Sequence, residues 1–187
     1  MITYNVNGAE RFLRNNLDEI TIPEFEKICL SMTLDADDYF DRYINIFSVI
    51  GMTTEDIETI SPNEFVDLIK KFDITKWENT IFQKEIVADG RTFEAYRGDK
   101  FILSIRDLAK IEKYIKNDKE KYLGEILAVI YKDTSVSKEL WYNDKHIATK
   151  AELFREHIKA DVVLPYINLI LNDVMVKLNE TLLNGNK

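Results

Sequence analysis

The sequence predicts a mainly α-helical fold of the α+β kind. We expect a compact helical domain with a small β-hairpin or three-stranded meander near residues 84–103 and a long apolar C-terminal helix. Apolar residues recur at helical spacing along most of the chain, alternate with polar residues near 84–103, and crowd several sides of the last segment. The chain of 187 residues is 45% hydrophobic, which is enough to enclose one sizeable core.

The chain divides into three predicted segments. Residues 1–20 are polar and weakly patterned, and we interpret them as an acidic extended arm that can include a short helix near Glu10–Asn16. Residues 21–158 should form the helical domain with its hairpin insert. Residues 159–187 should form the long C-terminal helix and a tail. One folded unit with an appendage at each end is therefore expected.

Several predicted helices have recognisable first turns. A hydroxyl cap, a proline in the first turn and an acidic residue close behind all favour a helix start. These signals occur at Thr21-Ile22-Pro23, Thr53-Thr54, Ser61-Pro62-Asn63-Glu64 and Ser104-Ile105-Arg106-Asp107. A further helix is expected from Ala36 to Ile50, where Gly51 ends it, and its apolar stripe should be formed by Tyr39, Tyr43, Ile46, Phe47 and Ile50. An apolar, buried helix is expected up to Ile130.

The spacing of the apolar residues changes between Glu85 and Tyr96. Two short strands are predicted there around an Asp89-Gly90 turn, with room for a third strand at Lys100–Leu103. The stretch Asp133–Lys145 is interpreted as a polar linker that carries an aromatic pair. A helix from about Thr149 to Ile158 follows, and the last helix should run from Asp161 to about Leu183.

The net charge of −8 is concentrated in the first third of the chain. Residues 1–60 hold four basic and twelve acidic residues, so the remainder is neutral overall. An acidic surface does not attract phosphate backbones, so we expect no direct binding of nucleic acid by this region. The excess either keeps acidic helix faces soluble or attracts a basic protein partner.

The sequence contains no motif that identifies a reaction. Cys29 falls on the inner face of a helix, and His146 and His157 match no metal-ligand pattern. The acidic run Asp35–Asp41 lacks the glycine and glutamate of a calcium loop. The lysines at 110, 113 and 116 are interpreted as a solvated helix face, with contact to nucleic acid or an acidic protein as the alternative. We predict no catalytic residue, no metal site and no cofactor.

The last helix is the best sequence candidate for an interaction surface. A helix that is apolar on several sides must be covered either by its own domain or by another chain. Exposed aromatic residues are also efficient contact anchors, because they bury a large area at low entropic cost. The predicted partner-binding residues are Tyr4, Trp141, Tyr142, Tyr166, Ile170 and Val174.

The order of elements over about residues 20–160 resembles a family of phage proteins. The segments that carry the resemblance are Phe25-Glu26-Lys27-Ile28, Gly51–Ile57, Ser61-Pro62-Asn63-Glu64-Phe65, Arg106-Asp107-Leu108 and Tyr122–Tyr131. This order is similar to that of small assembly proteins of tailed bacteriophages, of the tail-assembly-chaperone or baseplate-hub-assembly type. The resemblance implies non-enzymatic protein binding during particle assembly.

The expected function is therefore that of a phage morphogenesis or virion structural protein in the tail, portal or connector region. Its partners would be other phage structural proteins or copies of itself. A tail assembly chaperone absent from the mature virion and a small enzyme with a carboxylate-based site are the alternatives. No apolar run reaches the roughly 18 residues that cross a bilayer, and the N-terminus lacks a secretory pattern. We expect assembly in the host cytoplasm, location in the virion and no membrane partner.

Overall fold

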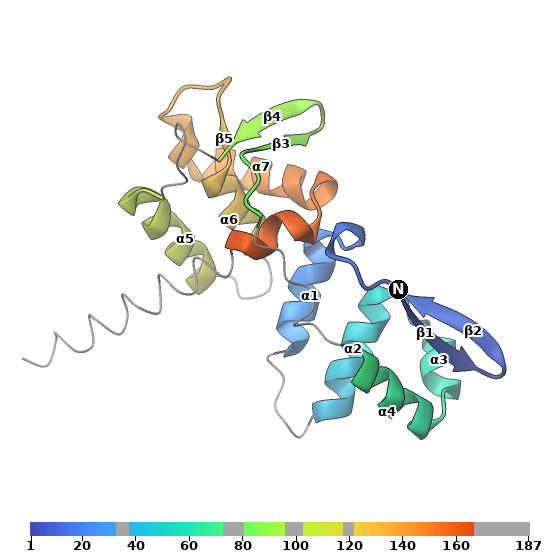
Figure 1. Ribbon diagram of the computed structural model, residues 1–187. Helices are drawn as coiled ribbons and strands as arrows, with labels where there is room; N and C mark the ends of the chain where they lie inside the picture. The colour runs from blue at the N-terminus through green and yellow to red at the C-terminus, as the bar shows by residue number, and fades with distance from the viewer. Residues whose placement is uncertain (33–37, 73–80, 96–102, 118–121, 167–187) are drawn as a thin grey trace, which may run out of the picture.

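The computed structural model describes residues 1–32, 38–72, 81–95, 103–117 and 122–166. Two groups of elements meet at helix α1 (Figure 1). The N-terminal lobe contains β1 (Ile2–Val6), β2 (Ala9–Leu13), the 3-10 turn η1 (Leu17–Glu19), α1 (Ile22–Met32), α2 (Tyr39–Ile50), α3 (Thr54–Thr59) and α4 (Pro62–Lys71). The C-terminal lobe contains β3 (Glu85–Ala88), β4 (Arg91–Glu94), α5 (Ile105–Asn117), α6 (Leu123–Ile130), β5 (Lys132–Asp133), η4 (Leu140–Tyr142) and α7 (Asp144–His157).

Helices dominate the described chain, and two small antiparallel sheets accompany them. The predicted mainly α, α+β class is thus confirmed. No long C-terminal helix occurs among the described residues, where 160–166 form a short helical stretch. The rest of the expected last helix, with Ile170 and Val174, lies outside the described residues.

The first thirteen residues form a β-hairpin, so the prediction of an extended arm is wrong. Strand β1 pairs with β2 around Asn7 and Gly8, whose φ angles of 52° and 79° suit a tight hairpin turn. Ile2, Tyr4 and Val6 alternate inward and are buried. The predicted helix near Glu10–Asn16 is wrong, because β2 runs to Leu13 and residues 14–16 are not helical. The Asn-Gly pair was the local signal for this hairpin.

The predicted helix starts are confirmed as capping boxes. In each box a hydroxyl accepts a backbone N–H three residues on, and the acid there accepts the N–H of the capping residue. The four pairs are Thr21 with Glu24, Thr53 with Asp56, Ser61 with Glu64, and Ser104 with Asp107. Local hydrogen bonds therefore fix where these helices begin.

The second sheet has the predicted Asp89-Gly90 hairpin but a different third strand. Strand β4 pairs with β5, which places Phe93 opposite Asp133. Leu103 is not in a strand, and 100–102 lie outside the described residues. The predicted linker from Asp133 thus starts in the sheet, and α7 begins earlier than expected because Asn143 caps it through the His146 N–H, at 3.1 Å.

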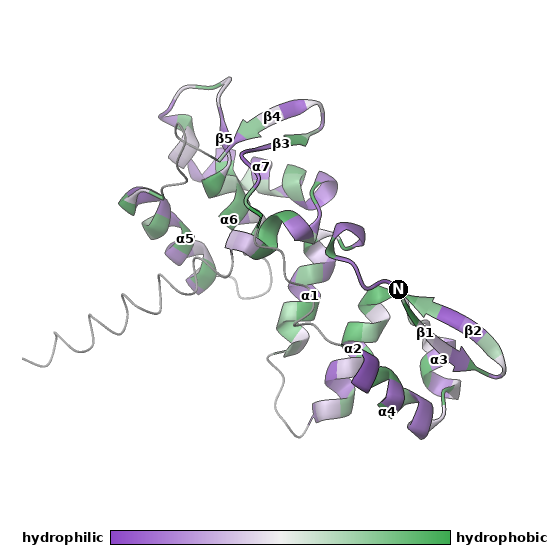
Figure 2. Cartoon of the chain, viewed as in Figure 1, coloured by the Kyte–Doolittle hydropathy of each residue, from purple (hydrophilic) through white to green (hydrophobic). Residues whose placement is uncertain are grey.

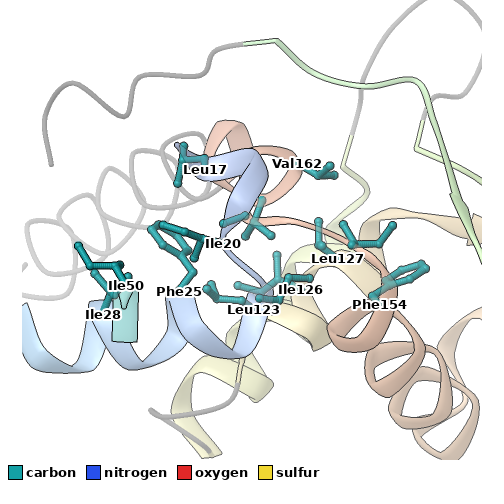
Figure 3. Close-up of a cluster of buried hydrophobic side chains, with 14 of the residues drawn as sticks. Leu17, Ile20, Phe25, Ile28, Ile50, Leu123, Ile126, Leu127, Phe154 and Val162 are labelled. Atoms are coloured by element: carbon teal, nitrogen blue, oxygen red, sulfur yellow. The ribbon is translucent and has the colours of Figure 1, made fainter. Parts of the chain in front are cut away.

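One apolar core joins the two lobes. Helix α6 is buried along nearly its whole length and packs on α7, as its hydrophobicity predicts. Ile20 and Phe25 of the N-terminal lobe lie beside Leu123 and Ile126 of α6 (Figure 3). A backbone hydrogen bond of 2.9 Å from Ala160 N to Ile20 O adds a second connection. Both lobes therefore belong to one folded unit.

Candidate functional site

The first turn of α2 presents two aromatic side chains to solvent. Tyr39 is 43% exposed and Phe40 is 54% exposed, although helical spacing placed Tyr39 on the inner side of its helix. Asp38 and Asp41 flank the pair and are exposed too. We call Asp38, Tyr39, Phe40 and Asp41 the acidic aromatic surface. It combines large contact area with negative charge, which suits recognition of another protein.

Contacts between aromatic rings connect the acidic aromatic surface to the core. The Phe40 ring lies 6.1 Å from that of Phe65, and the Tyr39 ring lies 5.0 Å from that of Tyr43. Buried Phe47 packs edge-on against Phe65 at 5.6 Å. Because each exposed ring rests on a more buried one, little side-chain freedom is left to lose when a partner binds.

Internal pairing leaves the surface of the N-terminal lobe strongly acidic. Two of the four basic side chains of residues 1–60 are used inside the lobe: Arg14 pairs with Glu24 at 2.7 Å and Arg11 with Asp56 at 3.6 Å. Within the described part of the first sixty residues, the exposed acidic residues are Glu10, Asp18, Asp38, Asp41, Glu55 and Glu58. Hydrophilic residues also cover much of α4 (Figure 2), where Lys70 and Lys71 balance the charge of Glu64 and Asp67. The lobe can therefore attract a basic partner over a broad area.

Two of the predicted partner-binding residues are core residues. The Tyr4 hydroxyl donates to Asp56 Oδ2 at 2.9 Å, and burial with this bond raises the pKa of Tyr4 to about 12. The Tyr166 hydroxyl donates to Gln83 O at 3.1 Å and lies 2.8 Å from the Tyr131 hydroxyl. Both side chains are almost fully buried, so neither is an exposed contact anchor.

Trp141 and Tyr142 are half-buried against their own lobe. The Trp141 indole N–H donates to Asp133 O at 2.8 Å. The Tyr142 ring faces two cations, with Arg106 Cζ at 4.0 Å and Lys132 Nζ at 4.6 Å from its centroid. These contacts position the η4 turn. Binding of a partner by Trp141 and Tyr142 stays a prediction.

The buried carboxylates of the described chain are held by structural partners. Asp107 pairs with Lys132 at 2.6 Å and closes the Ser104 box. Burial opposes ionisation of Asp107, but the bonds to Lys132 and Ser104 outweigh it and hold its pKa below the usual range. Asp133 accepts from the Ser135 N–H at 3.0 Å, and its pKa is lowered likewise. Both acids are held as carboxylates by these bonds. Their structural partners therefore account for their burial, and no catalytic role is needed to explain it.

Arg155 is the centre of a second polar cluster, at the seam between α1, α6 and α7. Its guanidinium donates to Glu152 at 2.7 Å and to Glu26 at 3.5 Å, and it also pairs with Glu125. Burial raises the pKa of Glu26 although Arg155 counteracts it. A pocket of about 370 Å³ adjoins the cluster and is lined by Pro23, Glu26, Glu152, Arg155 and Glu156. The cluster ties the two lobes together by charge.

The remaining chemical candidates have structural explanations. Burial raises the pKa of the Cys29 thiol to about 11, so little reactive thiolate is present at neutral pH. In the lysine stripe of α5, Lys110 and Lys113 both pair with Asp144, at 2.6 and 2.9 Å. Among the described residues, no group of three or more potential ligands could hold a metal ion.

Comparison with protein-family models, curated proteins and solved structures gives no match for this chain. The resemblance to phage assembly proteins therefore stays a prediction. Within the described ranges, no helix has the length and apolarity to cross a membrane.

Proposed function

We propose that the protein is a non-enzymatic assembly protein of a tailed bacteriophage that binds other structural proteins of the particle. The observation that carries the proposal is the exposed Tyr39–Phe40 pair within the acidic N-terminal lobe. The phage context rests on the order of elements over residues 20–160. The tail, portal or connector region is the expected place of action.

The two components of the acidic aromatic surface have different roles in binding. Tyr39 and Phe40 provide apolar area at the centre of the contact, where desolvation contributes most affinity. Asp38 and Asp41 lie around them and accelerate encounter with a basic face while disfavouring acidic ones. The proposed partner is therefore a structural protein with a basic surface around an apolar pocket.

A matched pair of variants tests the contact surface. Tyr39→Ser with Phe40→Ser removes the exposed rings, whereas Phe12→Ser removes a side chain of strand β2 that is 53% exposed, close to the 54% of Phe40. The tagged protein is produced during phage growth, and captured structural proteins are identified by cross-linking and mass spectrometry. We expect the α2 variant to lose at least tenfold of the captured phage protein and the β2 variant to retain it.

Mass spectrometry of purified particles separates the two versions of the proposal. A virion subunit is present at fixed stoichiometry in the particle, while a tail assembly chaperone is found only on partners in the cell. Equal capture by both variants would refute the α2 surface. Absence of any phage structural protein from the cross-links of the native chain would refute the function itself.

A further inference from the structure

Two buried lysines, Lys132 of β5 and Lys150 of α7, form a layer of basic side chains where α6, β5 and α7 meet. Lys150 is 3% exposed and Lys132 is 7% exposed. Lys132 pairs with Asp107, but within the described ranges the one acceptor of Lys150 Nζ is a backbone carbonyl, Tyr131 O, at 2.8 Å. Charge in this layer is therefore only partly balanced by carboxylates.

His146 lies at the edge of this layer, in the first turn of α7. Its Nε2 atom is buried and has no hydrogen-bond partner among the residues that the structure describes. The charged groups that act on it come from three elements: Lys150 on α7, Asp133 on β5 and Arg91 on β4. Two cations thus face the imidazole against one carboxylate, and Asp133 is already bonded to Ser135.

The neutral ring suits this position and the protonated ring does not. A neutral imidazole can keep its proton on Nδ1 and leave Nε2 bare, whereas an imidazolium needs an acceptor for the Nε2–H. A positive charge in the first turn of α7 also faces the positive end of the helix dipole. Burial, followed by the Lys150 charge, accordingly holds the pKa of His146 below its usual value of 6.5.

The segment that leads into α7 depends on this turn. Asn143 caps the helix through the His146 N–H, and two residues earlier the Trp141 indole is bonded to Asp133 O. The half-buried His146 side chain stands on the turn that carries this cap, so a charged ring that seeks water acts on the cap and on the η4 turn before it. We propose that His146 is a pH-sensitive latch, which holds residues 133–146 against α6 and α7 at neutral pH and releases them on mild acidification. This inference concerns the chain alone and does not depend on the proposed function.

The two histidines of the chain provide a matched test. The full-length protein is titrated from pH 7.5 to 4.5 by NMR, with the histidine ring signals and the Trp141 indole N–H followed together. Trp141→Phe identifies the indole signal. We expect His146 to titrate below 6.5, and the Trp141 indole and the amides of 133–146 to change with that midpoint and not with the earlier one near pH 7 that belongs to Lys150. His157→Gln, at the exposed other end of α7, should keep this transition, and His146→Gln should lose it.

Two results would overturn the latch. One is titration of His146 without any change at Trp141 or the amides of 133–146. The other is a Trp141 transition that persists at the same midpoint in His146→Gln. If His146→Gln does not fold, the test uses the native and His157→Gln proteins alone. In these proteins the midpoint of His146 and the midpoint of the Trp141 indole must coincide, and separate midpoints would contradict the proposal.

Discussion

Replacement of Gly124 by alanine tests how tightly α6 and α7 pack at the Arg155 cluster. A Cβ atom at Gly124 would lie 2.9 Å from Arg155 Cζ and 3.1 Å from Ala151 O. The guanidinium cannot move aside freely, because it is 7% exposed and bonded to Glu26, Glu125 and Glu152. Either the arginine leaves its partners or the two helices move apart.

Opposing free-energy terms decide the sign of the effect. Alanine is favoured over glycine within a helix by about 1 kcal/mol. Overpacking costs about 1–3 kcal/mol, and breaking a buried ion pair by displacing one partner costs about 3–5 kcal/mol. Partial loss of the Glu26–Arg155 pair therefore outweighs the helix propensity. We expect Gly124→Ala to lower the free energy of unfolding by about 2–4 kcal/mol.

Urea unfolding followed by circular dichroism measures this effect. The control is the same substitution in an Arg155→Ala background, where Cζ and Nε are gone and the cost of Gly124→Ala should fall by at least half. A Gly124→Ala protein as stable as the native one would refute the reasoning. An equal cost in both backgrounds would assign the clash to Ala151 O instead of the guanidinium.

Three further substitutions test individual interactions. Lys150 has a pKa of about 7 when folded, against 10.5 as an ordinary value, so the unfolded chain binds more protons between these pH values. The free energy of unfolding should therefore rise from pH 7 toward 10, by up to about 4 kcal/mol at about 1.36 kcal/mol per pH unit. Urea unfolding at several pH values measures this rise, and Lys150→Met should flatten it. The same rise in Lys150→Met would show that Lys150 is not its cause. Tyr4→Phe removes the donor to buried Asp56 and should cost about 1–2 kcal/mol in thermal unfolding, with no loss if that bond contributes nothing. Ser61→Ala removes a hydroxyl cap and should cost about 1 kcal/mol, and Ser61→Asp should restore most of it.

Elements with a local signal were predicted well, and those built from distant residues were not. The Ser61 capping box and the Asp89-Gly90 turn are complete within four residues, so the sequence alone indicates them. Strand β5 forms because Asp133 meets Phe93, forty positions away, and two residues carry no alternation to recognise. The hairpin at Asn7-Gly8 did have a local signal, which the polar composition of its neighbours masked.

The candidate site was only partly visible in the sequence. The charge of the run Asp35–Asp41 is evident in the sequence, and the run lacks the residues of a calcium loop. That mismatch says nothing about whether Tyr39 and Phe40 within the run are exposed. Helical spacing assigned Tyr39 to the buried stripe, but α2 begins at that residue and its first turn extends beyond the core. Exposure at a helix end depends on what packs there, and periodicity does not report it.

The capping acids connect local structure with the charge of the whole lobe. Glu24 closes a capping box and pairs with Arg14, and Asp56 closes another while accepting from Tyr4 and pairing with Arg11. A carboxylate used in this way removes one negative and one positive charge from the surface together. The pairing therefore stabilises helix starts without reducing the net charge of the lobe, and it leaves the unpaired excess on exposed acids such as Asp38 and Asp41. These exposed acids repel one another, and a basic partner of the kind proposed above would relieve that repulsion on binding.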